Sequence, residues 1–530
     1  MYLCTNYFAL EVQELLTMYS AHPQVSALVG LLDDKSCRNL FLKGLNGSGA
    51  ALTIASLFFK KRGSYVCVLN DQEEAGYFYH DLMQLTNSQD IFFFPSAYRR
   101  AIKYGHLDPA NEILRTEVLS RLQMPDLPTV IVTYPDALAE KVIAQADLKQ
   151  KTLQIGVGDK LDNMFVSDIL DEYGFEQVDY VYEPGQYAMR GSILDVFSFS
   201  HEFPYRIDFF GSEVETIRTF EVESQLSKSR LDRIAIVPEM NKSGLISTSL
   251  LESLSPNTIL AFGDLEWCKE KIGSIYREEP VLGDEESFTS AEQMRLRLVP
   301  EDEFLRSVLN FRRIAFGAKA AGTPDATVSF STRPQPIYHK NFDLVSSSFH
   351  AFLEEGYTLY ILSDVEKQAT RIRIIFEDRK EYIPFTSVNR TIHGGFADDT
   401  LKVCLFTDHQ LFDRFHKFNL KSEKARSGKI TLSLKELNQF TSGDYIVHID
   451  HGVGQFGGLV RTEVNGRIQE AIKLIYQNND IIFVSIHSLH KLSKYKGKES
   501  GEPPKLNKLG TGAWEKMKER TKKKVKDIAR

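Results

Sequence analysis

Residues 41–53 read FLKGLNGSGAALT, a short apolar run followed by a glycine-rich turn and the start of a helical pattern. An α/β domain places a phosphate-binding loop at such a strand-to-helix turn, and the loop needs the spacing GxxxxGK[ST]. The glycines have this spacing, but alanines replace the lysine that would reach the outer phosphates and the hydroxyl residue that would hold magnesium. We therefore predict a degenerate loop without ATP binding, and an unrelated glycine-rich turn would predict the same. The loop residues are Gly44, Gly47, Gly49, Ala50 and Ala51.

The composition is that of an ordinary globular protein of several domains. The chain has 530 residues, of which 42% are hydrophobic and 25% charged, with a formal net charge of -7. This balance excludes a collagenous or fully disordered chain, and it limits any DNA contact to a local patch. The five cysteines form no CxxC pair, which favours a reducing, cytoplasmic compartment. No signal peptide is evident, and no apolar run approaches the roughly 18 residues that span a membrane.

The predicted pattern of strands and helices changes several times along the chain. Short apolar runs alternate with helical patterns in the first third, which predicts a parallel sheet. Further on, strands separated by turns predict an inserted, mostly antiparallel module, and α/β patterns then return twice. We expect a multi-domain α/β protein with these segments: α/β domain 1–140, inserted α+β module 141–232, returning α/β part 233–322, small α/β domain 323–412, basic linker 413–434, β-barrel 435–495, and linker with a final helix 496–530.

Short strands and tight turns over residues 435–492 predict a small SH3/Tudor-like β-barrel. Asn465-Gly466 is a strong signal for a two-residue hairpin. The GxGxxG match at residues 452–457 precedes strand residues rather than a helix, so we reject a dinucleotide site and expect a turn and a bulge there. The basic stretch 513–530 predicts a helix that stops without a cap, as if the chain were cut inside a longer protein.

Other patterns carry less chemistry. The pairs His448/His451 and His487/His490 have i, i+3 spacing, but odd offsets on strands point to opposite faces, so we expect no metal. Arginines and acids interleave over residues 187–197, 205–210 and 213–218. They predict either a cross-strand ion-pair ladder or a polar docking sheet, and the residues alone favour the ladder. With no nucleophile pattern evident, the chain is typical of a binding scaffold rather than an enzyme.

Four stretches of sequence give the chain a family resemblance. Residues 183–197, EPGQYAMRGSILDVF, with 204–211, PYRIDFFG, resemble the UvrB-like module of bacterial transcription-repair coupling factors (Mfd). Residues 442–456, SGDYIVHIDHGVGQF, resemble the start of the RNA-polymerase-interacting domain of that family, and residues 504–516, PKLNKLGTGAWEK, resemble the approach to its relay helix. The resemblance covers almost the whole chain and is weakest at residues 242–330.

The resemblance implies a function and a set of partners. Such factors release RNA polymerase stalled at a lesion with an ATP-driven double-stranded DNA translocase, and they recruit the excinuclease through its component UvrA. The translocase, with its ATP and magnesium, would follow residue 530, so no cofactor and no catalytic residue is expected in this chain, and we expect a cytoplasmic monomer. Carried over by position, the UvrA surface is Arg190, Gly191, Asp195 and Phe197, and the surface for the RNA polymerase β subunit is Leu459, Val460, Arg461, Thr462 and Glu463.

Two other functions remain open at this point. One is an active UvrB-like repair helicase or ATPase, against which Ala50 and Ala51 argue. The other is a transcription regulator of the CarD type, which would use only the terminal barrel. The long UvrB-like region argues against that alternative. Because the chain has no intact ATPase motif, we predict that it is enzymatically inactive alone.

Overall fold

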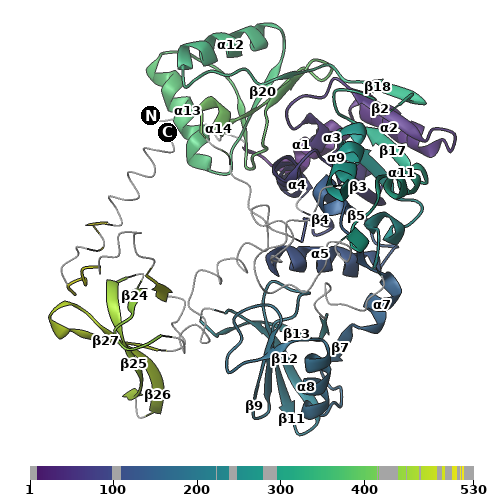
Figure 1. Cartoon of the computed structure of the whole chain (residues 1–530). Coiled ribbons are helices and arrows are strands. Elements are labelled where there is room, and N and C mark those ends of the chain that lie inside the picture. Colours follow the sequence, from purple (N-terminus) through teal and green to yellow (C-terminus); the bar gives the residue numbers. More distant parts are fainter. Residues whose placement is uncertain are drawn as a thin grey trace. The chain divides into compact units, whose positions relative to one another are not determined.

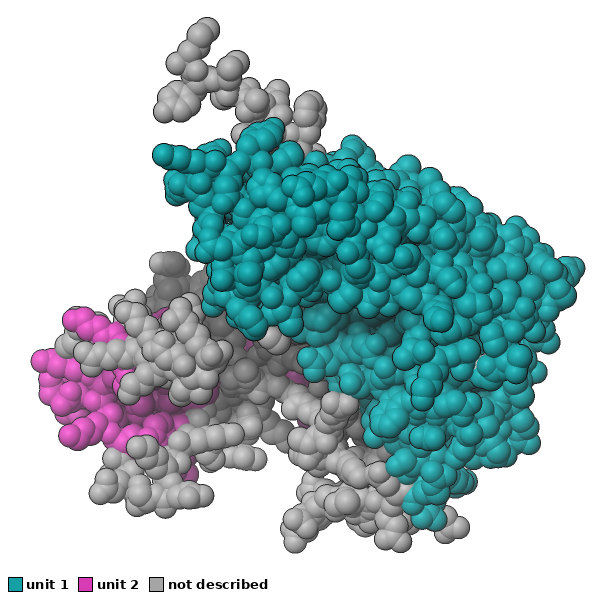
Figure 2. All heavy atoms as spheres, turned by 90° about the horizontal axis from the view of Figure 1, so that it is seen from above, with its two compact units in different colours: residues 1–152, 240–422 teal, residues 153–239, 423–530 magenta. Residues whose placement is uncertain are grey.

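A computed structural model gives the fold (Figure 1). It describes residues 9–86, 88–97, 109–222, 224–237, 247–277, 295–320, 322–414, 416, 440–448, 450–464, 467–485, 492–495, 504–509, 514 and 516–517. Several expectations therefore lie wholly or largely outside the described residues: the basic linker beyond His416, the His487/His490 pair and the helix over 513–530. No helix in the described part is both long and apolar enough to cross a membrane. Two compact units result, residues 1–152 with 240–422 and residues 153–239 with 423–530 (Figure 2).

The first unit is built on a parallel sheet of seven strands in the order β18-β2-β17-β16-β3-β5-β4. Its strand β5 is buried along its whole length, as its β-branched sequence TVIVT requires when both faces are covered. The strands are β2 (Asn39–Lys43), β3 (Ser64–Val68), β4 (Ile91–Phe93), β5 (Thr129–Thr133), β16 (Ile259–Phe262), β17 (Arg312–Ala315) and β18 (Ala326–Ser329).

Helices pack around this sheet in two groups. The helices α1 (Val12–Ser20), α2 (Pro23–Asp33), α3 (Gly49–Lys60) and α4 (Gln72–Thr86) contact one another. A second group joins α9 (Leu265–Arg277) to α6 (Pro135–Leu138) and α11 (Glu301–Leu309). The remaining elements are α5 (Pro109–Leu122), which packs on β4, and α7 (Gln145–Gln150), β6 (Val142–Ile143), β15 (Ser247–Thr248) and the 3-10 turn η1 (Leu250–Ser253).

A second sheet in the same unit has the order β1-β21-β20-β23-β22-β19. Its edge strand β1 (Ala9–Leu10) comes from near the N-terminus and pairs in parallel with β21 (Thr386–Val388), a pairing that no sequence pattern predicts. The other elements are β19 (Thr332–Pro334), α12 (Phe342–Glu354), β20 (Thr358–Leu362), α13 (Glu366–Asp378), β22 (Phe396–Asp398), β23 (Val403–Thr407) and α14 (Asp408–Leu411).

The sheets correct the boundary expected between the two α/β parts. Strand β18 pairs with β2 of the first sheet, so that sheet continues past residue 323. The linker-like composition of residues 321–327 reflects a turn before an edge strand rather than a domain junction. Asp325 fixes this turn because its carboxylate accepts hydrogen bonds from the backbone amides of Arg38 and Asn39, both at 2.8 Å.

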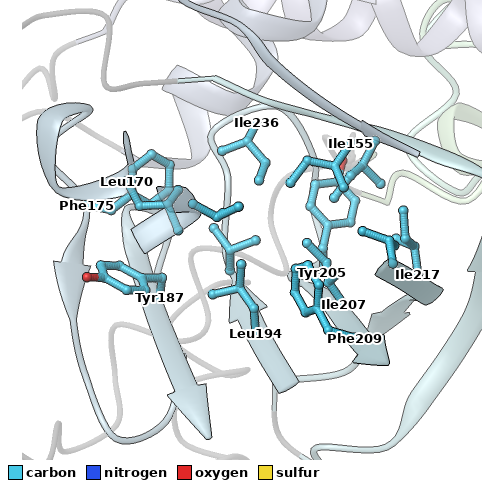
Figure 3. Packing of buried hydrophobic residues seen from close by; sticks show 14 of the residues in the cluster. Ile155, Leu170, Phe175, Tyr187, Leu194, Tyr205, Ile207, Phe209, Ile217 and Ile236 are labelled. Atoms are coloured by element: carbon cyan, nitrogen blue, oxygen red, sulfur yellow. The ribbon is translucent and has the colours of Figure 1, made fainter. Parts of the chain in front are cut away.

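The inserted module is a mostly antiparallel sheet, whose edge strand β8 runs parallel to β9, and one helix packs against it. Figure 3 shows the buried apolar residues that form its core. Strand β11 alternates buried and part-exposed residues, as expected for a sheet with one covered face. Residues of α8, β7 and β14 pack with one face of the sheet into a single core. The elements are β7 (Leu153–Gly156), α8 (Asn163–Glu172), β8 (Glu176–Gln177), β9 (Gln186–Arg190), β10 (Ile193–Val196), β11 (Tyr205–Phe210), β12 (Glu213–Phe220), β13 (Ser227–Leu231) and β14 (Arg233–Ile236).

The edges of this module differ from those expected. Strand β14 pairs with β7, so the residues assigned to the returning α/β part at 233 still belong to the inserted module. Residues 142–143 and 145–150 form β6 and α7 within the first unit, so the module begins at β7 rather than at 141. A pair of four-residue strands far apart in sequence has no local pattern that would mark it as one ladder.

The last described sheet has five antiparallel strands in the order β27-β26-β25-β24-β28. Val464 pairs with Arg467, so β25 and β26 pair as consecutive antiparallel strands, while the expected turn residues 465–466 lie outside the described residues. The register shifts between Phe456 and Leu459, which confirms the expected bulge. The elements are β24 (Tyr445–His448), β25 (Gly452–Val464), β26 (Arg467–Ile475), the 3-10 turn η3 (Gln477–Asn479), β27 (Ile481–Ser485) and β28 (Leu492–Lys494).

Candidate functional site

The degenerate loop has the backbone shape of a phosphate loop. It runs from the end of β2 to the first turn of α3, the junction at which a parallel sheet places such loops. Gly44 and Gly47 adopt positive φ angles of 84° and 52°, which glycine reaches without strain. The glycine spacing therefore builds the turn, while Ala50 and Ala51 lie in the first turn of α3 without the side chains that handle phosphate and magnesium.

Two amides of this loop, those of Asn46 and Ser48, already have partners outside it. The Ser48 amide donates to the carbonyl oxygen of Gly394 at 2.8 Å, and the Gly394 amide donates to Ser48 Oγ at 2.9 Å. The Asn46 amide donates to Thr332 Oγ1 at 2.9 Å. A Cβ on Gly47 would lie 2.6 Å from the Gly394 carbonyl oxygen. The close contact between these two backbone segments therefore also requires a glycine at position 47. The second sheet thus supplies carbonyl and hydroxyl oxygens where an active loop would hold phosphate oxygens.

A cavity of about 590 Å³ remains beside the loop, at the carboxyl ends of the strands of the first sheet. Helices α4 and α9 begin there, and helix N-termini normally attract anions. Carboxylates occupy both: Asp71 accepts from the amides of Glu73 and Glu74 at 2.8 and 3.0 Å, and Asp264 accepts from the Trp267 amide at 2.9 Å. These caps offset the partial positive charge that would otherwise favour a nucleotide.

Four histidines gather next to this cavity. The His409 and His416 rings stack with centroids 4.4 Å apart, and His80 and His393 lie within 5.1 and 5.7 Å of His416. Burial lowers the pKa of His393, and it lowers the pKa of His409 and His416 to about 4. Among the described residues no group of three or more ligand side chains has a metal-binding arrangement.

The open face of the inserted sheet carries an ion-pair network centred on Asp195. Its fully buried carboxylate accepts from Arg206 Nε and Nη2 at 2.7 and 2.8 Å, and it also pairs with Arg190. The hydrogen bonds that Arg206 donates to Asp195 raise the pKa of Arg206. Arg190 Nη1 donates in addition to the carbonyl oxygen of Asp179 at 2.9 Å. The ladder expected from the interleaved charges therefore forms, with a buried carboxylate as its centre.

Of the four residues proposed for the UvrA surface, two join the ion-pair network, one lies in an exposed turn and one is buried. Arg190 and Asp195 meet in the network, and Gly191 lies in the exposed β9–β10 turn with φ at 63°. Phe197 is only 1% exposed, so its side chain belongs to the interior. Phe210, at 80% exposure, is an accessible aromatic residue that the sequence reasoning missed.

Arg206 and Arg218 lie in the segments expected to form the ladder but were not named for the UvrA surface, and the register places them in the same row as Asp195. Cross-strand pairing aligns Asp195, Arg206, Arg218 and Arg230 in one row across four strands. Arg218 pairs with Asp208, which lies one row away. The alternation in YRIDFF, residues 205–210, was the available signal, because every second residue there faces away from the core.

Strand β25 presents an open edge in the last sheet. Residues 452–455 pair with β24, whereas residues 459–464 pair only with β26 among the described strands. The five residues proposed for polymerase contact, 459–463, lie in this second half. Leu459 is 46% exposed, and on the outer strand β27 Ile481 and Phe483 are 45% and 54% exposed. Within the described residues, this sheet therefore has an unpaired backbone edge and exposed apolar side chains.

Two protein-family models match the segments of the chain that form these two sheets. The family model described as the UvrB interaction domain matches residues 153–241, and that of the CarD-like/TRCF RID domain matches residues 440–496. The chain is 23% identical to the transcription-repair-coupling factor of Bacillus subtilis over 92% of its length. It is 24% identical to that of Escherichia coli and 23% to that of Staphylococcus aureus, each over 93%.

The chain resembles the N-terminal portion of a transcription-repair coupling factor. It spans about half the length of the curated relatives it matches, 48% of each of the three. The first family match begins at residue 153, which is also the first residue of β7. The match and the β7–β14 pairing therefore place the start of the inserted module at the same residue. Both family matches fall on sheets with an accessible polar face or edge.

We expect the chain to bind ATP no more tightly than millimolar, measured by calorimetry with magnesium present. Restoring the motif with Ala50→Lys and Ala51→Thr should not create a site, because Gly394 and Thr332 still occupy the loop amides. Micromolar, magnesium-dependent binding by the native chain would contradict the degenerate loop. Such binding by the double variant would show that the loop remains open.

We expect stability to fall through the histidine cluster as the pH is lowered from about 6.5 towards about 4. The unfolded histidines titrate near 6.5, whereas burial holds the pKa of His409 and His416 near 4 in the folded chain. Their contribution is therefore complete above about pH 6.5 and is lost as the pH falls towards about 4. Urea melts should show this slope, and His409→Gln with His416→Asn should flatten it. An unchanged slope in the double variant would contradict the assignment.

Proposed function

We propose that this chain is the recruiting part of a factor that couples stalled RNA polymerase to nucleotide excision repair. The observation that carries the proposal is the presence, in one chain, of two separate sheets that match a UvrB interaction domain and an RNA-polymerase-interacting domain. The closed loop supports a scaffold rather than a UvrB-like ATPase. In the whole protein, ATP, magnesium and double-stranded DNA would be bound by a motor that is not in these residues.

The inserted sheet is the proposed surface for UvrA. Its open face holds Arg190, Arg206 and Arg218 in fixed positions through Asp195 and Asp208, and Phe210 supplies an exposed aromatic group. Arginine and aromatic residues are the side chains that most often dominate binding energy in interfaces. Because the carboxylates already orient the guanidinium groups, a partner would lose little side-chain entropy in meeting them.

The last sheet is the proposed surface for the β subunit of RNA polymerase. We infer that its five strands form the core of the expected SH3/Tudor-like barrel and that the free half of β25 accepts a strand from the partner. Main-chain hydrogen bonds along such an edge supply affinity that depends little on side-chain identity. A monomer in the cytoplasm is the state we expect for this function.

We expect Arg190→Glu to weaken UvrA binding by several-fold to about a hundred-fold, about 1–3 kcal/mol, measured by calorimetry. Arg190 also neutralises the buried Asp195, so a charge reversal there could act through the fold. Phe210→Ser is the matched variant, because its side chain is 80% exposed and lies outside the ion-pair network.

Circular dichroism and thermal melts decide between the two causes. Phe210→Ser should melt like the native chain and still bind UvrA at least several-fold more weakly. If both variants bind normally, this face is not the UvrA surface. If Arg190→Glu alone loses binding and also loses stability, the network around Asp195 is structural only.

We expect Thr462→Pro and Thr462→Arg to abolish capture of the RNA polymerase β subunit by the full chain. Proline removes an amide and distorts the free edge, and arginine tests tolerance to side-chain size at the contact. UvrA binding should be unchanged in both, which serves as the control for the rest of the chain. A variant that melts like the native chain and still captures the β subunit would reject this strand as the interface.

A further inference from the structure

The cavity beside the closed loop has a charge opposite to that of a nucleotide site. Carboxylates from five residues line it, and no lysine or arginine does so within the described part of the chain. At about 590 Å³ the cavity has the size of a small-molecule site. The lining carboxylates are Asp71, Glu73, Glu74, Asp81 and Asp264.

One buried acceptor in this lining has no hydrogen-bond partner. Asn70 Oδ1 is buried and accepts no hydrogen bond from the described residues. Asp81, which is only 3% exposed, accepts from the His393 amide at 2.7 Å and lies 4.0 Å from His80 Nδ1, but no described lysine or arginine pairs with its carboxylate. Buried acceptors are normally satisfied, so Asn70 indicates a place for a hydrogen-bond donor, and the surrounding carboxylates favour a cationic one.

The acidic groups are spread along the cavity rather than gathered at one point. Glu74 and Asp81 are seven residues apart on α4, which places them on one face and about 10 Å apart at 1.5 Å per residue. Between them lie the rings of Tyr77 and Phe78, which stack on His393 and Phe316 with centroids 3.6 and 5.6 Å apart. The wall thus alternates acceptors with apolar surface.

We propose that this cavity binds a linear organic polyamine. Ammonium groups would meet the carboxylates and the free acceptor of Asn70, and the methylene segments would lie against the aromatic rings. Burial raises the pKa of Glu74, and a nearby cation would relieve the cost of keeping that carboxylate charged. A divalent metal is a poorer match, because it needs oxygen ligands converging on one point. This proposal does not rest on the proposed repair function.

The test is a calorimetric titration of spermidine into the full chain at low ionic strength. We expect saturable binding at one site, weakened at least tenfold by Glu73→Gln with Glu74→Gln. The matched control, Asp302→Asn with Glu303→Gln on α11, makes the same change in net charge outside the cavity and should leave binding unchanged. Ala50→Leu keeps every charge but fills space in the cavity, and it should also weaken binding.

Each outcome bears on the proposal. Equal losses in the cavity and control variants would show that spermidine is held only by the overall negative charge, and would overturn it. Binding that survives Ala50→Leu would place the ligand elsewhere. Magnesium that competes at equal concentration would reject an organic cation as the specific ligand. Thermal melts of the variants without ligand verify that each one is folded.

Discussion

The reciprocal hydrogen bonds between Ser48 and Gly394 tie the two sheets of the first unit together at the one place where a nucleotide could have bound. A second connection lies in the interior, where the carboxylate of Asp398 accepts from Tyr19 at 3.1 Å and lies 3.2 Å from His22 Nε2. Burial opposes ionisation of Asp398, yet the hydrogen bonds it accepts hold its pKa below the usual value. The phosphate-loop geometry therefore serves packing in a chain that lacks the side chains for its chemistry.

Much of this could be predicted from local patterns. Glycine spacing identified the loop, Asn465-Gly466 identified a hairpin, and interleaved charges identified a ladder, because each depends on residues close in sequence. The pairing of β14 with β7 and of β18 with β2 depends on segments that meet only in the fold, so composition placed both boundaries incorrectly. The same reason hid the Gly394 contact, since residues 48 and 394 share no local signal.

The candidate docking surface was predicted in position but not in detail. Arg190 and Asp195 are in the network, whereas Phe197 is buried and Phe210 is exposed. The alternation of apolar and polar residues along a single strand does not show which of its two faces is buried. In this module the buried face is the one against which α8 packs. The histidines show the opposite case, because the four that gather come from separate elements rather than from the i, i+3 pairs that sequence spacing emphasised.

The strand β1 has a consequence for how the chain is made. Residues 9–10 pair with residues 387–388, so a strand that leaves the ribosome early must wait for its neighbour. At about 5–20 residues per second, roughly 20–80 s of synthesis separates the two. Throughout that interval the nascent chain carries an unpaired strand, and Tyr19 of α1 lacks its later partner Asp398. Translation speed and chaperone access during this interval should therefore affect the yield of folded protein.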